Sequence, residues 1–102
     1  TMMTVITETT LKPGQEQEWD RAFEERLRAA KQQPGWVDTQ LLIPEDEPNK
    51  RVVVGTWRSR DDWERWHETP PFRQTREPLN RSSMDDGRPE WHKVQAREAM
   101  QA

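Results

Sequence analysis

The sequence predicts a single α+β domain with one antiparallel sheet and three helices, and three observations lead to this fold class. The chain has 102 residues, which is the length of one domain. Stretches rich in β-branched residues alternate with stretches whose apolar residues recur every three or four positions. Proline and glycine stand between these stretches, where strands and helices are expected to end.

The amino-acid composition agrees with a folded domain, although the chain is poor in aliphatic residues. Leu, Ile, Val and Phe make up only 15 of the 102 residues. Disordered chains share this feature, but they usually carry a high net charge, whereas the formal net charge here is −3. The chain also has six Trp residues, each able to bury about 150–250 Å². We therefore expect residues 3–99 to form one domain with a tryptophan-rich core.

The first strand and the first helix follow from a change in the spacing of apolar residues. Residues 3–10 are rich in β-branched side chains and predict a strand that ends at the turn Lys12-Pro13-Gly14. From residue 15 to residue 33 the spacing becomes that of a helix with one apolar face. Trp19, Ala22, Phe23, Leu27 and Ala30 occupy this face. The Glu and Arg residues between them are expected to face solvent.

Two further strands are predicted after this helix. Pro34-Gly35 ends the helix, because proline cannot continue it and glycine accepts the turn. Residues 36–43 then predict a second strand, and residues 51–57 predict a third. The acidic, proline-containing stretch 44–49 between them is typical of a hairpin loop.

Two short helices are predicted next. Ser59 is followed three residues later by Asp62, a variant of the capping box that marks the start of a helix. Thr69 is also a capping residue type, and the Pro-Pro pair that follows it favours the first helical turn. We therefore predict a second short helix over residues 71–80.

Residues 90–97 are predicted to form the last strand, which completes the ferredoxin-like order βαββααβ. Two of the earlier strands contain continuous apolar runs, Leu41–Ile43 and Val52–Val54. A sheet with one face in water should alternate apolar and polar residues, so both faces are expected to be covered at these runs. The helices of one chain cover one face only. We therefore expect a homodimer in which a second subunit covers the other face.

Several classes of function are disfavoured by residues that the chain lacks. Without Cys there is no disulfide framework, thiol nucleophile or thiolate metal site. No run of about 18 apolar residues could span a membrane, and the first residues lack the pattern of a signal peptide. The 16 basic residues are interleaved with 19 acidic ones, which argues against nucleic-acid binding. We therefore expect a cytoplasmic protein that binds neither membranes nor nucleic acid.

The stretch Trp57–Trp66 (WRSRDDWERW), followed by Pro71-Phe72, resembles a motif of the antibiotic biosynthesis monooxygenase (ABM) family. The likeness extends to the strand before the Leu11–Gly14 turn and to the helix that ends at Pro34-Gly35. It implies a homodimeric α+β barrel of ferredoxin-like domains. It also implies a cavity between helices and sheet in which a small, flat aromatic ligand reacts with O2, in most members without flavin or a dedicated metal.

The motif looks most like that of the haem-degrading branch of this family. That branch carries an Asn on the first strand, a Trp on the helix and, ten residues further on, a His that binds iron. In this chain Trp66 stands at the Trp position, whereas Thr7 and Arg76 stand at the Asn and His positions. Haem binding would therefore need His67 or His92 as the ligand, or no axial histidine.

The resemblance also implies a role for each candidate residue. Trp66 would form a wall of the pocket, Arg76 would stabilise the charge of an ionised substrate, and Thr7 would face the substrate as a polar group. The further residues expected to contact the substrate are Trp63, Phe72 and His92.

Ordinary structural roles are open for several of these residues. Large aromatic residues dominate cores as well as pockets, so Trp66 could simply pack in the core. Arg76 could be a solvated helix residue paired with Glu77. His67 directly follows Trp66 on its helix and is rotated from it by about 100°, so we expect His67 at solvent or at an interface. His92 could face either side of the sheet, and it is a candidate general base.

The resemblance implies a cofactor-independent monooxygenase that acts with O2 on a small planar aromatic or quinol substrate. Two alternatives are open at this point. One is a haem-binding or haem-degrading monooxygenase, and the other is a non-catalytic dimeric module that binds a ligand. Two isolated histidines without a carboxylate cluster predict no metal site.

Overall fold

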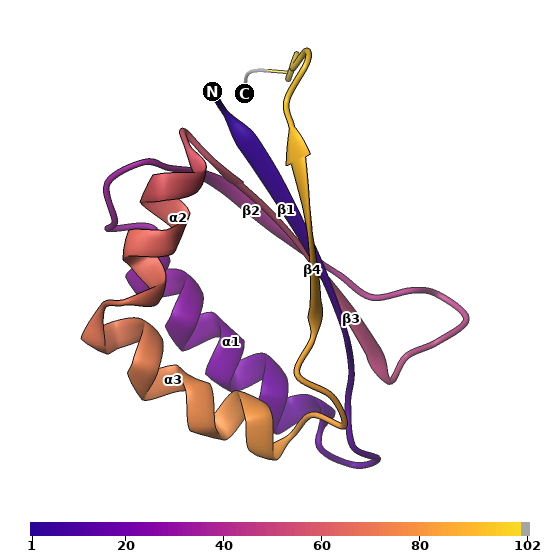
Figure 1. Cartoon of the computed structure of the whole chain (residues 1–102). Coiled ribbons are helices and arrows are strands. Elements are labelled where there is room, and N and C mark those ends of the chain that lie inside the picture. The colour runs from indigo at the N-terminus through magenta and orange to yellow at the C-terminus, as the bar shows by residue number, and fades with distance from the viewer. Residues whose placement is uncertain (101–102) are drawn as a thin grey trace.

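The elements of the chain follow the predicted order. A computed structural model describes residues 1–100, and Figure 1 shows their arrangement. The strands and helices are β1 (Met3–Thr10), α1 (Glu16–Ala30), β2 (Trp36–Leu42), β3 (Lys50–Trp57), α2 (Arg60–His67), α3 (Pro70–Arg81) and β4 (Arg88–Lys93). The α+β class and the ferredoxin-like order are therefore confirmed.

The four strands form one antiparallel sheet with the order β2-β3-β1-β4. All three helices lie on one face of this sheet, and α1 and α3 pack side by side (Figure 1). No helix of residues 1–100 covers the opposite face (Figure 1). No helix among residues 1–100 combines the length and the apolar character that crossing a membrane would require.

The two short helices begin where the sequence predicts, but only one of them is capped as expected. The Ser59 hydroxyl accepts a hydrogen bond from the backbone N–H of Asp62 at 3.1 Å, as a capping residue should. Thr69 makes no capping bond, because its hydroxyl instead donates to the carbonyl of Trp66 at 2.7 Å. The prediction of a capping threonine was wrong. The Pro-Pro pair does occupy the first turn of α3, as predicted.

The last strand differs from its prediction, because β4 spans Arg88–Lys93 rather than residues 90–97. Its limits are set by pairing with β1, since Glu8 pairs with Arg88 and Met3 pairs with Lys93. Residues after Lys93 have no further part of β1 to pair with as a strand. Pro89 is tolerated within β4 because this strand lies at the edge of the sheet.

The core between the helices and the sheet is rich in tryptophan, as predicted. Trp57 and Trp66 are 3 % and 4 % exposed and belong to one buried cluster, and Trp19 is 4 % exposed within a second. The first cluster is built from Met3, Val5, Ala30, Trp57, Trp66 and Phe72. The second is built from Leu11, Trp19, Ala22, Phe23 and Leu79.

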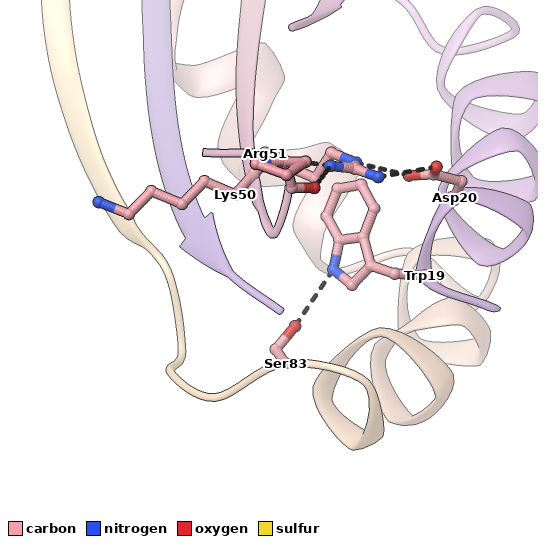
Figure 2. A network of polar contacts seen from close by, with 6 residues as sticks. Trp19, Asp20, Lys50, Arg51 and Ser83 are labelled. Atoms are coloured by element: carbon pink, nitrogen blue, oxygen red, sulfur yellow. Dashed lines mark hydrogen bonds and ion pairs between the residues drawn. The ribbon is translucent and has the colours of Figure 1, made fainter. Parts of the chain in front are cut away.

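A buried arginine attaches the helix layer to the sheet at the β3 end nearest the β2–β3 loop. The Arg51 guanidinium donates from Nε and Nη2 to the two Asp20 carboxylate oxygens, at 2.8 and 3.1 Å, so that β3 is joined to α1 (Figure 2). Its Nη1 donates to the carbonyls of Pro48 and Lys50, each at 2.8 Å. These four contacts satisfy a side chain that is almost fully buried.

The face of the sheet that points away from the helices is partly apolar. Ile6 of β1 pairs with Val54 of β3, and Glu8 pairs with Val52, so these residues alternate with those that face the helices. Leu42 and Ile43 at the end of β2 are 45 % and 49 % exposed. Among residues 1–100, the helices cover only the other face of the sheet.

Candidate functional site

A cavity of about 460 Å³ lies between the helices and the sheet. This volume is within the range of small-molecule sites, which is roughly 300–1,000 Å³. The sheet contributes Val5, Thr7 and Gly55, whose side of the strands faces the helices. Each of the three helices contributes side chains to the remaining walls. A planar ligand of one to three fused rings is the size of molecule that such a space accommodates.

Five of the six residues singled out in the sequence line this cavity. They come from β1, α2 and α3, and are Thr7, Trp63, Trp66, Phe72 and Arg76. The fold thus brings together residues that are up to 69 positions apart in the chain. Their proposed roles toward a substrate stay predictions.

His92 does not line this cavity. It pairs with Thr4 on β1, whose neighbours Met3 and Val5 point toward the helices, so His92 lies on the opposite face of the sheet. In β4 it is Trp91 and Pro89 that turn toward the helix side. The prediction that His92 contacts a substrate in the cavity is therefore corrected, because the register of β4 turns its side chain the other way.

Trp66 combines the two roles that the sequence left open. Its ring is buried and packs against Trp57 and Phe72, with centroids 6.4 and 5.4 Å away. The same side chain lines the cavity. It belongs to the core and to the cavity wall at once.

His67 is a cavity residue that the sequence analysis placed at solvent or at an interface. It stands four residues after Trp63 and therefore shares that residue's face of α2 rather than pointing away from the site. Its half-buried ring lies between the rings of Trp63 and Phe72, at centroid distances of 3.4 and 4.0 Å. The spacing to Trp63 was visible in the sequence and would have indicated this position.

The imidazole of His67 is neutral at physiological pH. Burial is the main cause that lowers its pKa to about 4, and the charges of Arg26 and Arg76 lower it further. Its Nδ1 lies 2.8 Å from the carbonyl oxygen of Trp63. A neutral ring can bond a carbonyl only through a protonated nitrogen, so Nδ1 donates and Nε2 keeps a free lone pair.

Arg26 is the second cavity residue that the sequence analysis missed. The Arg residues of α1 were expected to face solvent, but Arg26 comes three residues after Phe23 and lies along the apolar face of the helix. Its Nε donates to Thr75 Oγ1 at 2.9 Å, and its Nη2 donates to the carbonyl of Phe72 at 3.3 Å. Burial, and secondly the charge of Arg76, lower the pKa of Arg26 to about 10.

Arg76 is exposed and also lines the cavity, which places its guanidinium where the cavity meets solvent. The expected partner Glu77 instead forms an ion pair with Arg81 at 3.5 Å. Among residues 1–100, no carboxylate forms an ion pair with Arg26 or Arg76. Two guanidinium groups therefore line the cavity without forming an ion pair to a carboxylate of residues 1–100.

The described part of the chain has no cluster of three or more His, Asp or Glu side chains that could hold a metal ion. His67 is the one imidazole of residues 1–100 that lines the cavity. The cavity has an aromatic lining, two guanidinium groups and a neutral imidazole, and the carboxylates of Asp85 and Asp86 also line it. This combination suits an aromatic ligand that carries or develops negative charge.

Comparisons with other proteins agree with this architecture. Residues 2–78 match the family model described as "Antibiotic biosynthesis monooxygenase". Comparison with curated protein sequences gives no match.

Several solved structures share the fold at low sequence identity. SnoaB, a cofactor-independent oxygenase from Streptomyces nogalater, is 23% identical with a TM-score of 0.81, and 97% of this chain and 96% of SnoaB are covered. Rv0793 from Mycobacterium tuberculosis is 12% identical with a TM-score of 0.86, covering 97% of this chain and 100% of that one. A conserved protein from Methanosarcina mazei Go1 is 12% identical with a TM-score of 0.85, with coverage of 90% and 91%.

Proposed function

The chain belongs to the antibiotic biosynthesis monooxygenase family, and from this premise we propose that it oxygenates a small planar aromatic or quinol substrate with O2 in the cavity between helices and sheet. The observation that carries the proposal is an aromatic cavity lining together with two guanidinium groups that form no ion pair to a carboxylate of residues 1–100. The shared fold of SnoaB, a cofactor-independent oxygenase, supports a reaction without flavin or a metal.

In the proposed reaction the substrate binds as its anion. Arg76 lowers the pKa of a bound phenol or anthrone, because positive charge favours the ionised form of an acid. The electron-rich anion passes one electron to O2, and the resulting radical pair combines to a peroxide. Loss of water from the peroxide converts a ring CH2 group into a carbonyl, so that one oxygen atom enters the product and the other leaves as water.

The other residues of the cavity hold the substrate and its proton. Trp66 forms a wall against which the flat ring packs, with Trp63 and Phe72 as further aromatic contacts. Thr7 offers a hydroxyl to a polar substituent. His67 joins the residues predicted from the sequence, since the lone pair on its Nε2 can accept a hydrogen bond from a substrate hydroxyl.

The test is oxygen consumption by the purified protein with a panel of anthrones and quinols. We expect uptake of one O2 per molecule of anthrone, with a product mass that corresponds to exchange of two hydrogens for one oxygen. Uptake that equals the rate without protein for every member of the panel would contradict the proposal. It would favour the non-catalytic ligand-binding module.

Haem is the second candidate ligand, and only His67 favours it, because its neutral imidazole lines the cavity. The position at which the haem-degrading branch carries its iron ligand is Arg76, which cannot ligate iron. Titration with hemin distinguishes the two candidates. A shift of the Soret band that is lost in His67→Gln would support haem, and no shift would remove this alternative.

We also propose that the protein is a homodimer whose open sheet faces pack together. The support is the apolar character of that face, where Ile6, Val52 and Val54 are only half-buried and Leu42 is 45 % exposed. Light scattering at micromolar concentration should give twice the mass of one chain. A Val54→Lys variant, which places a charge in the proposed interface, should shift the mass toward one chain, and a monomeric wild-type protein would contradict the dimer.

A further inference from the structure

Arg26 is suited to bind an anion, because two hydrogen bonds fix its guanidinium while its other N–H groups make no hydrogen bond among residues 1–100. Two of its five N–H groups are used, one by Thr75 Oγ1 and one by the carbonyl of Phe72. The Thr75 hydroxyl in turn donates to the Phe72 carbonyl at 2.9 Å, so the orienting group is itself held. Arg26 therefore keeps three donors and a defined orientation.

The Nη1 atom of Arg26 makes no hydrogen bond among residues 1–100, and it is not sealed inside the protein. Among residues 1–100, no buried side-chain nitrogen or oxygen lacks a hydrogen-bond partner, so the unused Nη1 is not enclosed. Arg26 itself lines the cavity. A guanidinium that is partly removed from water and not paired with a carboxylate is costly, and a bound anion would relieve that cost.

Positive charge gathers around one aromatic ring of the cavity. The Cζ atom of Arg26 lies 3.9 Å from the centroid of Phe72, and that of Arg76 lies 5.6 Å from the same centroid. The His67 ring lies 4.0 Å from it. Each of the two arginines lowers the pKa of His67, and Arg76 lowers the pKa of Arg26, as expected for a site where like charges face each other.

The acidic side chains of the cavity lie elsewhere. Asp85 and Asp86 belong to the segment that follows α3, and Asp85 already accepts hydrogen bonds from the backbone N–H groups of Thr10 and Gly87. That segment lies beside Trp19, whose indole donates to Ser83 (Figure 2). Arg26 is two helical turns further along α1, a rise of roughly 10 Å, so these carboxylates do not neutralise it.

Space for a ring system lies over the sheet at Gly55, in the same cavity that the two arginines line. Gly55 of β3 contributes no side chain, and a Cβ atom built there would meet nothing nearer than Trp57 Nε1 at 3.7 Å and Val5 Cγ1 at 3.8 Å. Trp57 and Trp66 border the same space. A planar ring placed there would have apolar surfaces around it and the guanidinium groups at one side.

We propose that the cavity selects aromatic acids, with the ring between the sheet and the tryptophans and a carboxylate held by Arg26 beside Phe72, while Arg76 faces the ionised ring. The inference rests on the proposed function for what happens to the ring, but it concerns binding alone. Arg26 is the specificity-determining residue, since its fork can bond both oxygens of a carboxylate. Thr75 is a positioning residue that acts through Arg26.

The test compares two ligands that differ in charge and share the same ring, 2-naphthoate and 2-naphthalenemethanol. Isothermal titration calorimetry on the 102-residue chain at low salt gives both dissociation constants. A charge-assisted hydrogen bond contributes enough to expect roughly 10- to 100-fold tighter binding of the carboxylate. In Arg26→Gln this preference should fall by about tenfold or more, and Thr75→Val should lower it to a smaller extent.

Exposed arginines on the same two helices serve as matched controls. Arg28→Gln on α1 and Arg73→Gln on α3 remove one positive charge each without touching the cavity lining, and both should keep the wild-type preference. Equal affinity for the two ligands in the wild-type protein would overturn the inference, and so would no measurable binding of 2-naphthoate. Arg26→Gln with an unchanged preference would also overturn it, because Arg26 would then be purely structural.

The preference for aromatic acids and the oxygenase activity can each be contradicted without contradicting the other. Oxygenation of neutral anthrones by a protein without preference for 2-naphthoate would overturn only the assignment of aromatic acids. A strong, Arg26-dependent preference in a protein that consumes no oxygen would overturn only the oxygenase.

Discussion

Arg51→Ala is expected to lower the free energy of unfolding by about 2–3 kcal/mol, because it removes a buried guanidinium and its hydrogen bonds to a half-buried carboxylate and to two carbonyls. Arg51 is 3 % exposed, and its loss leaves the Asp20 carboxylate and two carbonyl oxygens without their donor. Asp20 is the attachment point of α1, so the helix that carries Arg26 would also be loosened from the sheet. Urea denaturation followed by tryptophan fluorescence measures the change.

Lys50 provides the control on the neighbouring residue of the same strand. It pairs with Glu8 and Glu47 at 3.2 and 2.8 Å, and all three side chains are in contact with solvent (Figure 2 shows Lys50 extending away from Asp20). Exposed ion pairs contribute little to stability, so Lys50→Ala should change the free energy of unfolding much less than Arg51→Ala does. Similar losses for Lys50→Ala and Arg51→Ala would show that burial is not what makes the Arg51 pair important.

Trp66→Ala is expected to cost about 3–5 kcal/mol of stability, as large-to-small changes in a packed core do. Trp66 is 4 % exposed and contacts both Trp57 and Phe72, so alanine would leave a void that these rings cannot fill. The enlarged cavity should also bind planar aromatics less tightly. Stability alone therefore does not separate the core role from the wall role.

The variant Trp66→Phe distinguishes a role of Trp66 in the core from a role in the wall of the binding site. Phenylalanine keeps an aromatic ring at the site and should cost a smaller amount of stability, about 1–2 kcal/mol. If Trp66 forms a wall of the binding site, 2-naphthalenemethanol should bind about tenfold more weakly to this folded variant, because the ligand loses much of its contact area. An unchanged dissociation constant in Trp66→Phe would assign Trp66 to the core alone.

Local patterns predicted most of the fold. Residues 3–10 were placed correctly because β-branched side chains and the following Pro13-Gly14 define both the type and the end of β1. The last strand was misplaced because RPEWHK has neither alternation nor a stop signal. Its limits come from its partner β1, since Glu8 and Met3 pair with its two ends. Pairing of this kind depends on the tertiary structure and cannot be recognised from the sequence of the segment alone.

The candidate site was predicted in part for a similar reason. Trp63, Trp66 and Phe72 were found because large aromatic residues near the family motif stand out in the sequence. Arg26 was missed because a charged residue between apolar helix positions is usually solvent-exposed. Only the tertiary structure shows that Arg26 donates hydrogen bonds to Thr75 and Phe72. His67 was missed because its position was judged from Trp66 alone, whereas its four-residue spacing from Trp63 decides which way it points.

The central claim is that O2 reacts with an aromatic substrate inside the cavity, and filling the cavity tests it most directly. Gly55→Leu adds a side chain on the sheet side of the cavity. Gly55 has no positive φ angle, and an added Cβ atom would lie at least 3.7 Å from its neighbours. The measurement is incorporation of isotopically labelled O2 into an anthrone by the wild-type protein and by this variant. We predict one labelled oxygen per product molecule with the wild-type protein and a rate at least about tenfold lower with folded Gly55→Leu. Equal incorporation by both proteins, or none by the wild-type protein, would contradict the account.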